Sequence, residues 1–251
     1  MDELSVQSFI ESVRASDEFA NAIKFTEMKP SLHQSRRQFI RSLPPACRIL
    51  DLGGIHQAAT FGALVTLRYP YAFDELVIVD LPPPDKHPIF QQQTHAVQLE
   101  RVESPLGPVF YHYHSMTDLS AYQDESFDLV YSGQSIEHVT EREADVVLAE
   151  VKRVLRPGGY LALDTPNGRA CRLQQPEFIN PDHKVEYTHG ELAFKLEDLG
   201  LVIREAKGLN YLGLSLARGV FDQSEAAANS GVYAEIEDCY LLAYVAQRPD
   251  S

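Results

Sequence analysis

The chain has 251 residues, and its 22 basic and 36 acidic side chains give a formal net charge of −14. A surface this acidic repels phosphate backbones and anionic membranes at long range, which disfavours long nucleic acid and membrane partners. The acidic, amphipathic N-terminus does not resemble a signal peptide, and no apolar run approaches the roughly 20 residues that span a bilayer. Cys47, Cys171 and Cys239 form neither a metal-ligand spacing nor a disulfide framework, so we expect a cytoplasmic protein.

Two helices are predicted before the first strand. Apolar residues recur at helical intervals over residues 4–27. Pro30 is expected to interrupt this pattern, and a second helix is predicted from Ser31 to about Leu43, where Pro44 and Pro45 end it. The two helices would form a cover over the remainder of the chain.

From residue 46 onward, short apolar runs alternate with helical patterns. Runs of this length that end in polar residues or glycine are typical of buried parallel strands. Their alternation with helices indicates βαβ units with right-handed crossovers. The predicted strands cover residues 46–54, 75–82, 108–114, 126–133, 160–167, 201–207 and 239–248. The predicted helices between them cover residues 60–69, 141–155 and 189–199.

These elements predict a single α/β domain, doubly wound, with a mostly parallel seven-stranded sheet. The final strand is expected to run antiparallel at or near an edge of that sheet. We divide the chain into a helical N-terminal cover (1–45), a cofactor-binding core (46–206) and an acceptor-side segment with the last strand (207–251). Residues 82–107 and 208–237 carry no pattern that assigns them a structure.

Acidic residues follow the first two predicted strands, Asp51 after one and Asp80 after the next. In open α/β sheets, ligands bind outside the carboxyl ends of the strands. A carboxylate at the second strand end can accept both hydroxyls of a ribose. Gly53 and Gly54 lack side chains where a backbone must approach a ligand closely. The same residues would also serve in a plain strand-to-helix turn with an acidic helix cap.

The glycine loop differs from that of a nicotinamide-dinucleotide enzyme. Ile55 and Gln57 stand where such a loop has further glycines to approach a pyrophosphate. Asp51 would also repel a diphosphate, whereas it suits a ligand that carries a sulfonium and an ammonium group.

Four segments resemble, in order, the motifs of the class I S-adenosylmethionine-dependent methyltransferases, which have a Rossmann-like fold. They are RILDLGG, VIVD, SFDLVYSGQSIEHV and VKRVLRPGGYLALDTPN. The resemblance covers roughly residues 46–206 and is greatest to the ubiquinone-biosynthesis O-methyltransferases and to sugar and natural-product methyltransferases. The family usually reads D-x-G-x-G-x-G, and Ile55 and Gln57 replace the later glycines.

The resemblance implies S-adenosylmethionine as cofactor and assigns residues to it. Asp51, Gly53 and Gly54 would line its methionine end, and Asp80 would hold the ribose. The remaining contacts would be Leu81, Ser115 and Met116 around the adenine, with Gly133 and Gln134 beneath the cofactor.

Candidate catalytic residues follow the fourth and fifth predicted strands. These are Glu137 and His138 in one segment and His183 in the other. A hydroxyl acceptor needs a base or a metal to take up its proton. We expect the two histidines to face the transferred methyl group from opposite sides, with Glu137 supporting one of them. A purely structural role, in which Glu137 and His138 bond the loop and cap the next helix, also fits the sequence.

The same residues bear on a metal site. Their grouping resembles the small-RNA 2′-O-methyltransferases, in which two glutamates and two histidines bind a divalent ion. Gln134 stands here in place of the first glutamate, and the loss of that charge weakens a site for a hard cation. We therefore predict no metal ligands and favour a base.

The sequence thus predicts an S-adenosylmethionine-dependent methyltransferase that modifies a small hydroxylated acceptor, such as a sugar unit or natural product. N-methylation of a small amine is one alternative. A cofactor-binding scaffold without turnover is another, and a nicotinamide-dependent oxidoreductase is the competitor that shares the fold class. No oligomeric state follows from the sequence.

Overall fold

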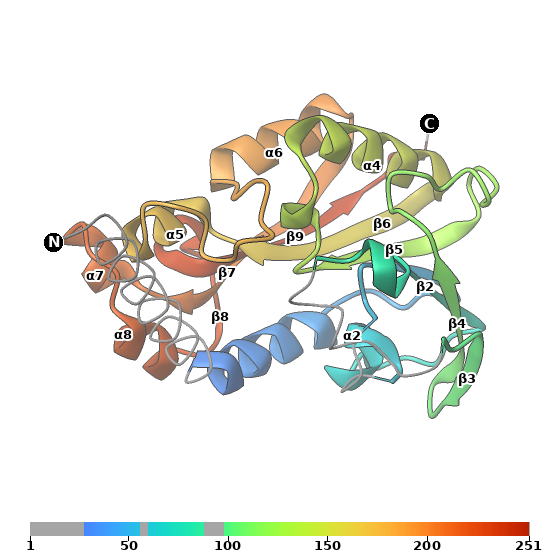
Figure 1. The fold of residues 1–251 in the computed structure, drawn as a ribbon, viewed down its shortest axis with the longest axis horizontal. Helices are drawn as coiled ribbons and strands as arrows, with labels where there is room; N and C mark the ends of the chain where they lie inside the picture. Colours follow the sequence, from blue (N-terminus) through green and yellow to red (C-terminus); the bar gives the residue numbers. More distant parts are fainter. Residues whose placement is uncertain (1–27, 56–59, 88–97, 251) are drawn as a thin grey trace, which may run out of the picture.

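The computed structural model describes residues 28–55, 60–87 and 98–250. In these residues the strands form one nine-stranded sheet in the order β3-β4-β2-β1-β5-β6-β9-β7-β8, with helices on both faces (Figure 1). The strands are β1 (Arg48–Leu52), β2 (Glu75–Asp80), β3 (Arg101–Ser104), β4 (Gly107–Tyr113), β5 (Phe127–Gly133), β6 (Leu155–Pro166), β7 (Val202–Tyr211), β8 (Val232–Tyr233) and β9 (Cys239–Gln247).

Strands β4, β2, β1, β5 and β6 are parallel neighbours. The chain begins at β1 in the middle, adds β2 and β4 on one side, and then adds β5 and β6 on the other. The order therefore reverses between β1 and β5, which is where open α/β sheets bind ligands at their carboxyl edge. Residues 49–52 and 76–79 are buried, as strands covered by helices on both faces must be.

Helices α4 and α6 cover one face of the sheet, whereas α2 and the helix at residues 28–41 lie on the other (Figure 1). Capping boxes fix the starts of α4 and α6, through Thr140 with Glu143 and Thr188 with Glu191. The helices are α2 (Gly62–Thr66), α4 (Glu141–Val154), α5 (Gly168–Gln174), α6 (His189–Asp198), α7 (Gly213–Ala217) and α8 (Gln223–Ala228). The described residues also form short 3₁₀ turns: η1 (Pro83–Asp85) after β2, η2 (Ile136–His138) after β5 and η3 (Ile236–Asp238) before β9.

The predicted fold class is confirmed, with two additions. All seven predicted strands are present, and the short antiparallel strands β3 and β8 extend the sheet at its two ends. They arise from the segments that carried no pattern. Strand β9 runs antiparallel, as predicted, and lies near the edge of the sheet, between β6 and β7.

Several boundaries differ from those predicted. Strand β6 begins at Leu155 rather than at residue 160, because Leu155 already pairs with Phe127 of β5 and the Arg-Pro-Gly-Gly segment forms an irregularity within the strand. The helix predicted from Ser31 to about Leu43 covers residues 28–41 among the described residues, so Pro30 lies in its first described turn. The helix predicted at residues 4–27 falls outside the described residues. Among the residues that the structure describes, no helix is long and apolar enough to cross a membrane.

Candidate active site

Asp51 lies at the carboxyl edge of β1 and is 1% exposed. Its Oδ2 atom is buried without a hydrogen-bond partner in the described part of the chain. Burial raises the pKa of Asp51 to about 7; Arg36 opposes the shift, and the negative charges of Asp80 and Asp164 add to it. A buried carboxylate oxygen without a partner is costly, so this group is suited to a cationic ligand.

The loop after β1 leaves no room for side chains at its two glycines. Gly53 has a φ of +79°, and a Cβ there would lie 2.6 Å from the Cβ of Ser135. A Cβ on Gly54 would lie 2.8 Å from Oδ2 of Asp51. Ile55, which departs from the family motif, points into the core and is 7% exposed. This placement lets the loop keep its bare backbone at the crevice, while Gln57 lies outside the described residues.

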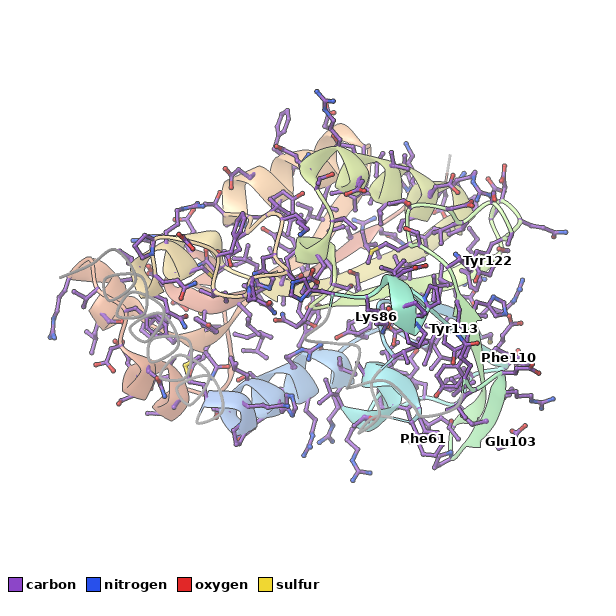
Figure 2. The ribbon with its side chains drawn as sticks, viewed as in Figure 1. Phe61, Lys86, Glu103, Phe110, Tyr113 and Tyr122 are labelled. Carbon is purple, nitrogen blue, oxygen red and sulfur yellow. The ribbon has the colours of Figure 1, made fainter. Side chains whose placement is uncertain are left out.

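The carboxylate of Asp80 is held by three nitrogen atoms. Its Oδ2 accepts hydrogen bonds from the backbone N–H of Ile55 at 3.0 Å and from Nζ of Lys86 at 2.7 Å. Its Oδ1 accepts from the backbone N–H of Leu81 at 2.7 Å. Lys86 comes from the η1 segment, which carried no sequence motif, and it is labelled in Figure 2. A ribose bound by Asp80 would therefore share the carboxylate with the ammonium group of Lys86.

The residues assigned to the adenine lie on two different segments. Leu81 directly follows β2 and is 37% exposed. Ser115 and Met116 follow β4, and Oγ of Ser115 lies 2.7 Å from Oγ1 of Thr117. The terminal methyl of Met116 lies 3.9 Å from the position that a Cβ on Gly53 would take. The fold thus brings Met116 beside the glycine loop.

A buried ion pair links the helix at residues 28–41 to the sheet. Nε of Arg36 lies 2.7 Å from Oδ1 of Asp164, whose side chain is fully buried. Asp164 also accepts hydrogen bonds from the hydroxyl of Tyr131 at 2.6 Å and from Nε2 of Gln134 at 2.9 Å. Burial opposes the charged form of Arg36, but Asp164 and Tyr131 raise its pKa overall.

Gly133 and Gln134 fit around this ion pair. A Cβ on Gly133 would lie 2.3 Å from the Tyr131 hydroxyl and 2.6 Å from Nη2 of Arg36, so only glycine fits there. Gln134 has a φ of +59°, which is uncommon for a residue with a side chain. Strain of this kind concentrates at functional sites. The resemblance assigned Gly133 and Gln134 to the cofactor, whereas no sequence pattern marked Arg36 and Asp164 as partners.

The candidate catalytic side chains gather at the same edge of the sheet. Nδ1 of His183 lies 2.7 Å from Oε1 of Glu186, and both side chains are buried. Nδ1 of His138 lies 2.9 Å from Oδ2 of Asp182. The two imidazole rings meet edge to face, with centroids 5.0 Å apart.

This geometry differs from the expected one in two respects. The two rings are adjacent, so they do not face each other across a pocket. The Nδ1 atoms of both rings face Asp182 and Glu186 instead of Glu137, whose Oε2 accepts a hydrogen bond from Oγ1 of Thr165 at 2.9 Å. The supporting carboxylates are Asp182 and Glu186, which lie within three residues of His183 in sequence. That closeness was the only signal that could have found them.

These side chains could also bind an ion. Donor atoms of Glu137, His138 and His183 all lie within 4.8 Å of one another. Gln134 stands in place of a fourth anionic ligand, and its amide nitrogen donates to Asp164. Three donors without that anion make a weak site for a hard cation.

Comparison with known proteins finds a matching domain family and solved structures with the same fold. Residues 75–163, which run from β2 into β6, match the model of a methyltransferase domain family. Residues 75–163 thus match a methyltransferase domain, and the fold of the chain is that of solved S-adenosylmethionine-dependent methyltransferases. The Asp51 carboxylate oxygen, which has no hydrogen-bond partner among the described residues, and the glycines at 53 and 54 suit the cationic methionine end of S-adenosylmethionine.

The relatives differ in how much of the chain they cover. A curated protein of Mycolicibacterium smegmatis, described as "Probable S-adenosylmethionine-dependent methyltransferase", is 35% identical over 94 residues. That match covers 38% of this chain and 35% of the relative, so it spans about a third of the relative's length.

Two solved structures share the fold across nearly the whole chain. A methyltransferase of Haloferax volcanii, solved in complex with the Trm112 methyltransferase activator, has a TM-score of 0.59 at 16% identity. The aligned region covers 93% of this chain and 96% of that one. A Thermotoga maritima protein, described as "SAM-dependent methyltransferase, possible histamine N-methyltransferase", has a TM-score of 0.58 at 18% identity. Its aligned region covers 94% of this chain and 97% of that one.

Proposed function

We propose that this protein transfers the methyl group of S-adenosylmethionine to a hydroxyl of a small acceptor, such as a sugar unit or a natural product. The observation that carries the proposal is the buried pair of His183 and Glu186, 2.7 Å apart, at the carboxyl edge of the sheet. A histidine oriented by a carboxylate is the arrangement that general bases commonly adopt.

The cofactor would occupy the crevice outside β1, β2 and β5. Asp51, Gly53 and Gly54 would hold its methionine end, and Asp80 would accept from the ribose hydroxyls. Leu81, Ser115 and Met116 would flank the adenine, with Gly133 and Gln134 beneath. When bound, it supplies a methyl group on a positively charged sulfur, which is already an activated leaving group. The protein then mainly has to align the acceptor and exclude water.

His183 would take up the proton that the acceptor hydroxyl releases. Its Nδ1 faces Glu186, so an Nδ1–H donates to that carboxylate and Nε2 carries the lone pair that accepts the proton. Glu186 would stabilise the resulting imidazolium, as the carboxylate does in other histidine dyads. His138, held by Asp182, would orient the acceptor beside it.

Cofactor affinity is expected to weaken as the pH falls through 7. Asp51, with a pKa of about 7 in the folded protein, must release a proton to face a cationic ligand. If Asp51 is fully ionised in the complex, the dissociation constant of S-adenosylmethionine should rise about tenfold between pH 8 and pH 6. Calorimetry at both pH values measures this change. An equal dissociation constant at both would contradict the role of Asp51, and Asp51→Asn should show a flat pH dependence.

The same raised pKa affects folding in the opposite sense. Without cofactor, the folded protein retains a proton on Asp51 that the unfolded chain releases above its ordinary value of 3.8. The contribution of Asp51 to stability is therefore fully present below that value and is lost as the pH rises toward 7.

Calorimetry also tests the cofactor assignment. S-adenosylmethionine and S-adenosylhomocysteine are expected to bind, and nicotinamide dinucleotides are not. Asp80→Asn should weaken binding by about 1.5–3 kcal/mol, the range for hydrogen bonds to a charged group. Asp124→Asn is the matched control, because Asp124 lies before β5 at the other edge and is 73% exposed. Tight NAD binding without a response to S-adenosylhomocysteine would refute the assignment.

The acceptor class needs a separate assay. Methyl transfer from labelled S-adenosylmethionine should be measured on paired hydroxyl and amine acceptors of similar size. An amine is already nucleophilic when neutral, so its methylation would not depend on His183. Activity on amines alone, unaffected by His183→Ala, would favour the N-methyltransferase alternative. Cofactor binding without transfer to any acceptor would favour a scaffold.

A further inference from the structure

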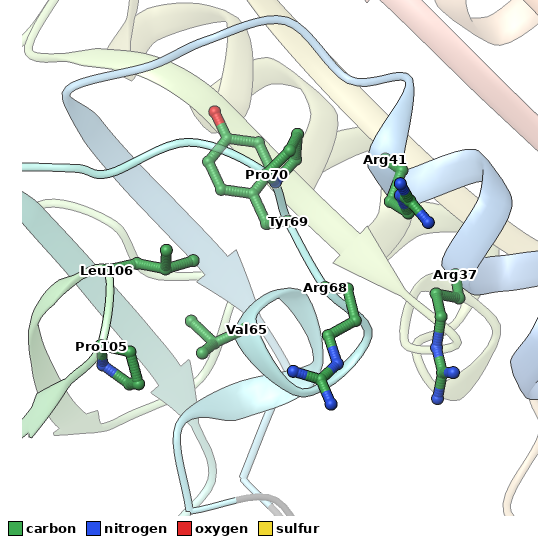
Figure 3. Close-up of a pocket in the computed structure, with 8 residues that line it drawn as sticks. All are labelled: Arg37, Arg41, Val65, Arg68, Tyr69, Pro70, Pro105 and Leu106. Atoms are coloured by element: carbon green, nitrogen blue, oxygen red, sulfur yellow. The ribbon is translucent and has the colours of Figure 1, made fainter.

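A groove at the edge of the sheet opposite to Asp51 and Asp80 is lined by three arginines. It has a volume of about 480 Å³, and Arg37, Arg41 and Arg68 project along it (Figure 3). Arg37 and Arg41 lie near the end of the helix at residues 28–41, and Arg68 follows α2. The turn between β3 and β4 forms the remaining wall. Since that turn precedes β4 and Arg68 precedes β2, the groove lies toward the amino ends of the parallel strands, away from Asp51 and Asp80.

The three guanidinium groups have no acidic partner within residues 28–55, 60–87 and 98–250. All three side chains are exposed, and none forms an ion pair with another described residue. This is unexpected in a chain with 36 acidic and 22 basic side chains, in which acids are in excess. The neighbouring Arg36, in contrast, is paired with Asp164. The groove is therefore a local concentration of positive charge on a protein whose net charge is negative.

The backbone at Arg68 carries an additional cost. Its φ is +76°, and it directly follows Leu67, the C-cap of α2. Helices commonly place glycine at this position because a side chain is strained there. Tyr69 anchors the turn, since it is buried and its hydroxyl donates to the carbonyl of Pro44 at 2.7 Å. The chain thus keeps an arginine where glycine would be more stable, and strain of this kind often accompanies a functional site.

The walls between the arginines are apolar. Val65, Pro70, Pro105 and Leu106 line the groove together with the ring of Tyr69. Guanidinium groups match phosphate oxygens with paired hydrogen bonds, and the apolar walls suit the organic part of a ligand. The volume lies within the range of about 300–1,000 Å³ that is typical of small-molecule sites.

We propose that this groove binds a phosphate-bearing small molecule about the size of a nucleotide. Three arginines balance the charge of a diphosphate or triphosphate group. Long nucleic acid fits less well, because the strongly acidic remainder of the surface repels an extended phosphate backbone. The site is separate from the cofactor crevice, and the proposal does not depend on methyl transfer.

Pyrophosphate is the probe, because the acidic residues Asp51 and Asp80 disfavour its binding in the cofactor crevice. Calorimetry on the full chain at low ionic strength should show binding, with an affinity that falls as salt is added. The double variant Arg37→Gln/Arg41→Gln should bind at least about tenfold more weakly. The matched control is Arg142→Gln/Arg218→Gln, which removes the same charge elsewhere and should bind as the unmodified protein does.

Arg68→Gly separates loss of binding from loss of folding. Glycine relieves the positive φ, so this variant should unfold at the same temperature as the unmodified protein or higher, and yet bind pyrophosphate more weakly. Absence of pyrophosphate binding to the unmodified protein would overturn the proposal, and so would equal binding by the Arg37→Gln/Arg41→Gln variant. Tighter binding of a hexaglutamate peptide than of pyrophosphate would also overturn it, in favour of an acidic protein segment.

Discussion

His183→Ala is expected to slow methyl transfer to a hydroxyl acceptor by about 10²–10⁴-fold, the usual contribution of a general base. Removal of the imidazole leaves the acceptor proton without a group to receive it, whereas the cofactor contacts at Asp51 and Asp80 are untouched. S-adenosylhomocysteine should therefore bind the variant with nearly unchanged affinity. Single-turnover rates with labelled cofactor, together with calorimetry, measure both effects on the same preparation.

Two controls define what this result would mean. Lys184→Ala changes the adjacent exposed side chain and should leave the rate within about twofold, because surface substitutions outside a site have small effects. Glu186→Gln keeps the size of the partner but removes its charge, so it should lower kcat more than it changes KM. Full activity in the His183→Ala/His138→Ala double variant would refute the base mechanism.

A metal mechanism predicts a different pattern. If Glu137, His138 and His183 held a divalent ion, a chelator would abolish turnover and added Mg²⁺ or Mn²⁺ would restore it. Gln134→Glu would then tighten the ion by supplying a hard anionic ligand. We expect no response to chelation, because the Gln134 side chain is bonded to Asp164 rather than directed at the histidines.

The strands were predictable because burial on both faces imposes continuous apolar runs, as in β1 and β2. Helix α4 was predictable because its buried residues recur at helical spacing after a capping box. Strand β3 was not, since Arg101–Ser104 is half exposed and polar at three of its four positions. Strand β8 has two residues, which is too short for any period to appear.

The residues of the candidate site also include some whose positions were predictable from the sequence and some whose positions were not. The positions of Asp51, Gly53 and Asp80 at one edge of the sheet were predictable because topology places the strand ends there, whatever the side-chain packing. Arg36 and Lys86 were not, because their partners are set by tertiary packing. The hydroxyl of Tyr131, which accepts from Arg36 at 3.1 Å, is 95 positions away in sequence. No local pattern encodes a contact of that separation.

Asp164→Asn is expected to lower the free energy of unfolding by about 3–5 kcal/mol, the cost of leaving a buried charge without its partner. Asparagine has the size of aspartate, so the change removes the charge that faces Arg36 and creates no cavity. Arg36 is only 11% exposed and cannot reach water without displacing the helix at residues 28–41. Urea denaturation measures the loss.

An exposed ion pair, Arg169 with Asp238, provides the control for the buried pair of Arg36 and Asp164. Asp238→Asn removes the charge that faces Arg169 in a pair whose side chains are 39% and 45% exposed, and should cost no more than about 1 kcal/mol. A similarly small loss in Asp164→Asn would contradict the buried ion pair. Because Arg36 joins the helix at residues 28–41 to β6, hydrogen exchange in that helix should accelerate in Asp164→Asn and not in Asp238→Asn. The apolar residues of this helix that lie in the core should hold it in place in both variants, so the difference in exchange between the two reports the ion pair beside Gly133.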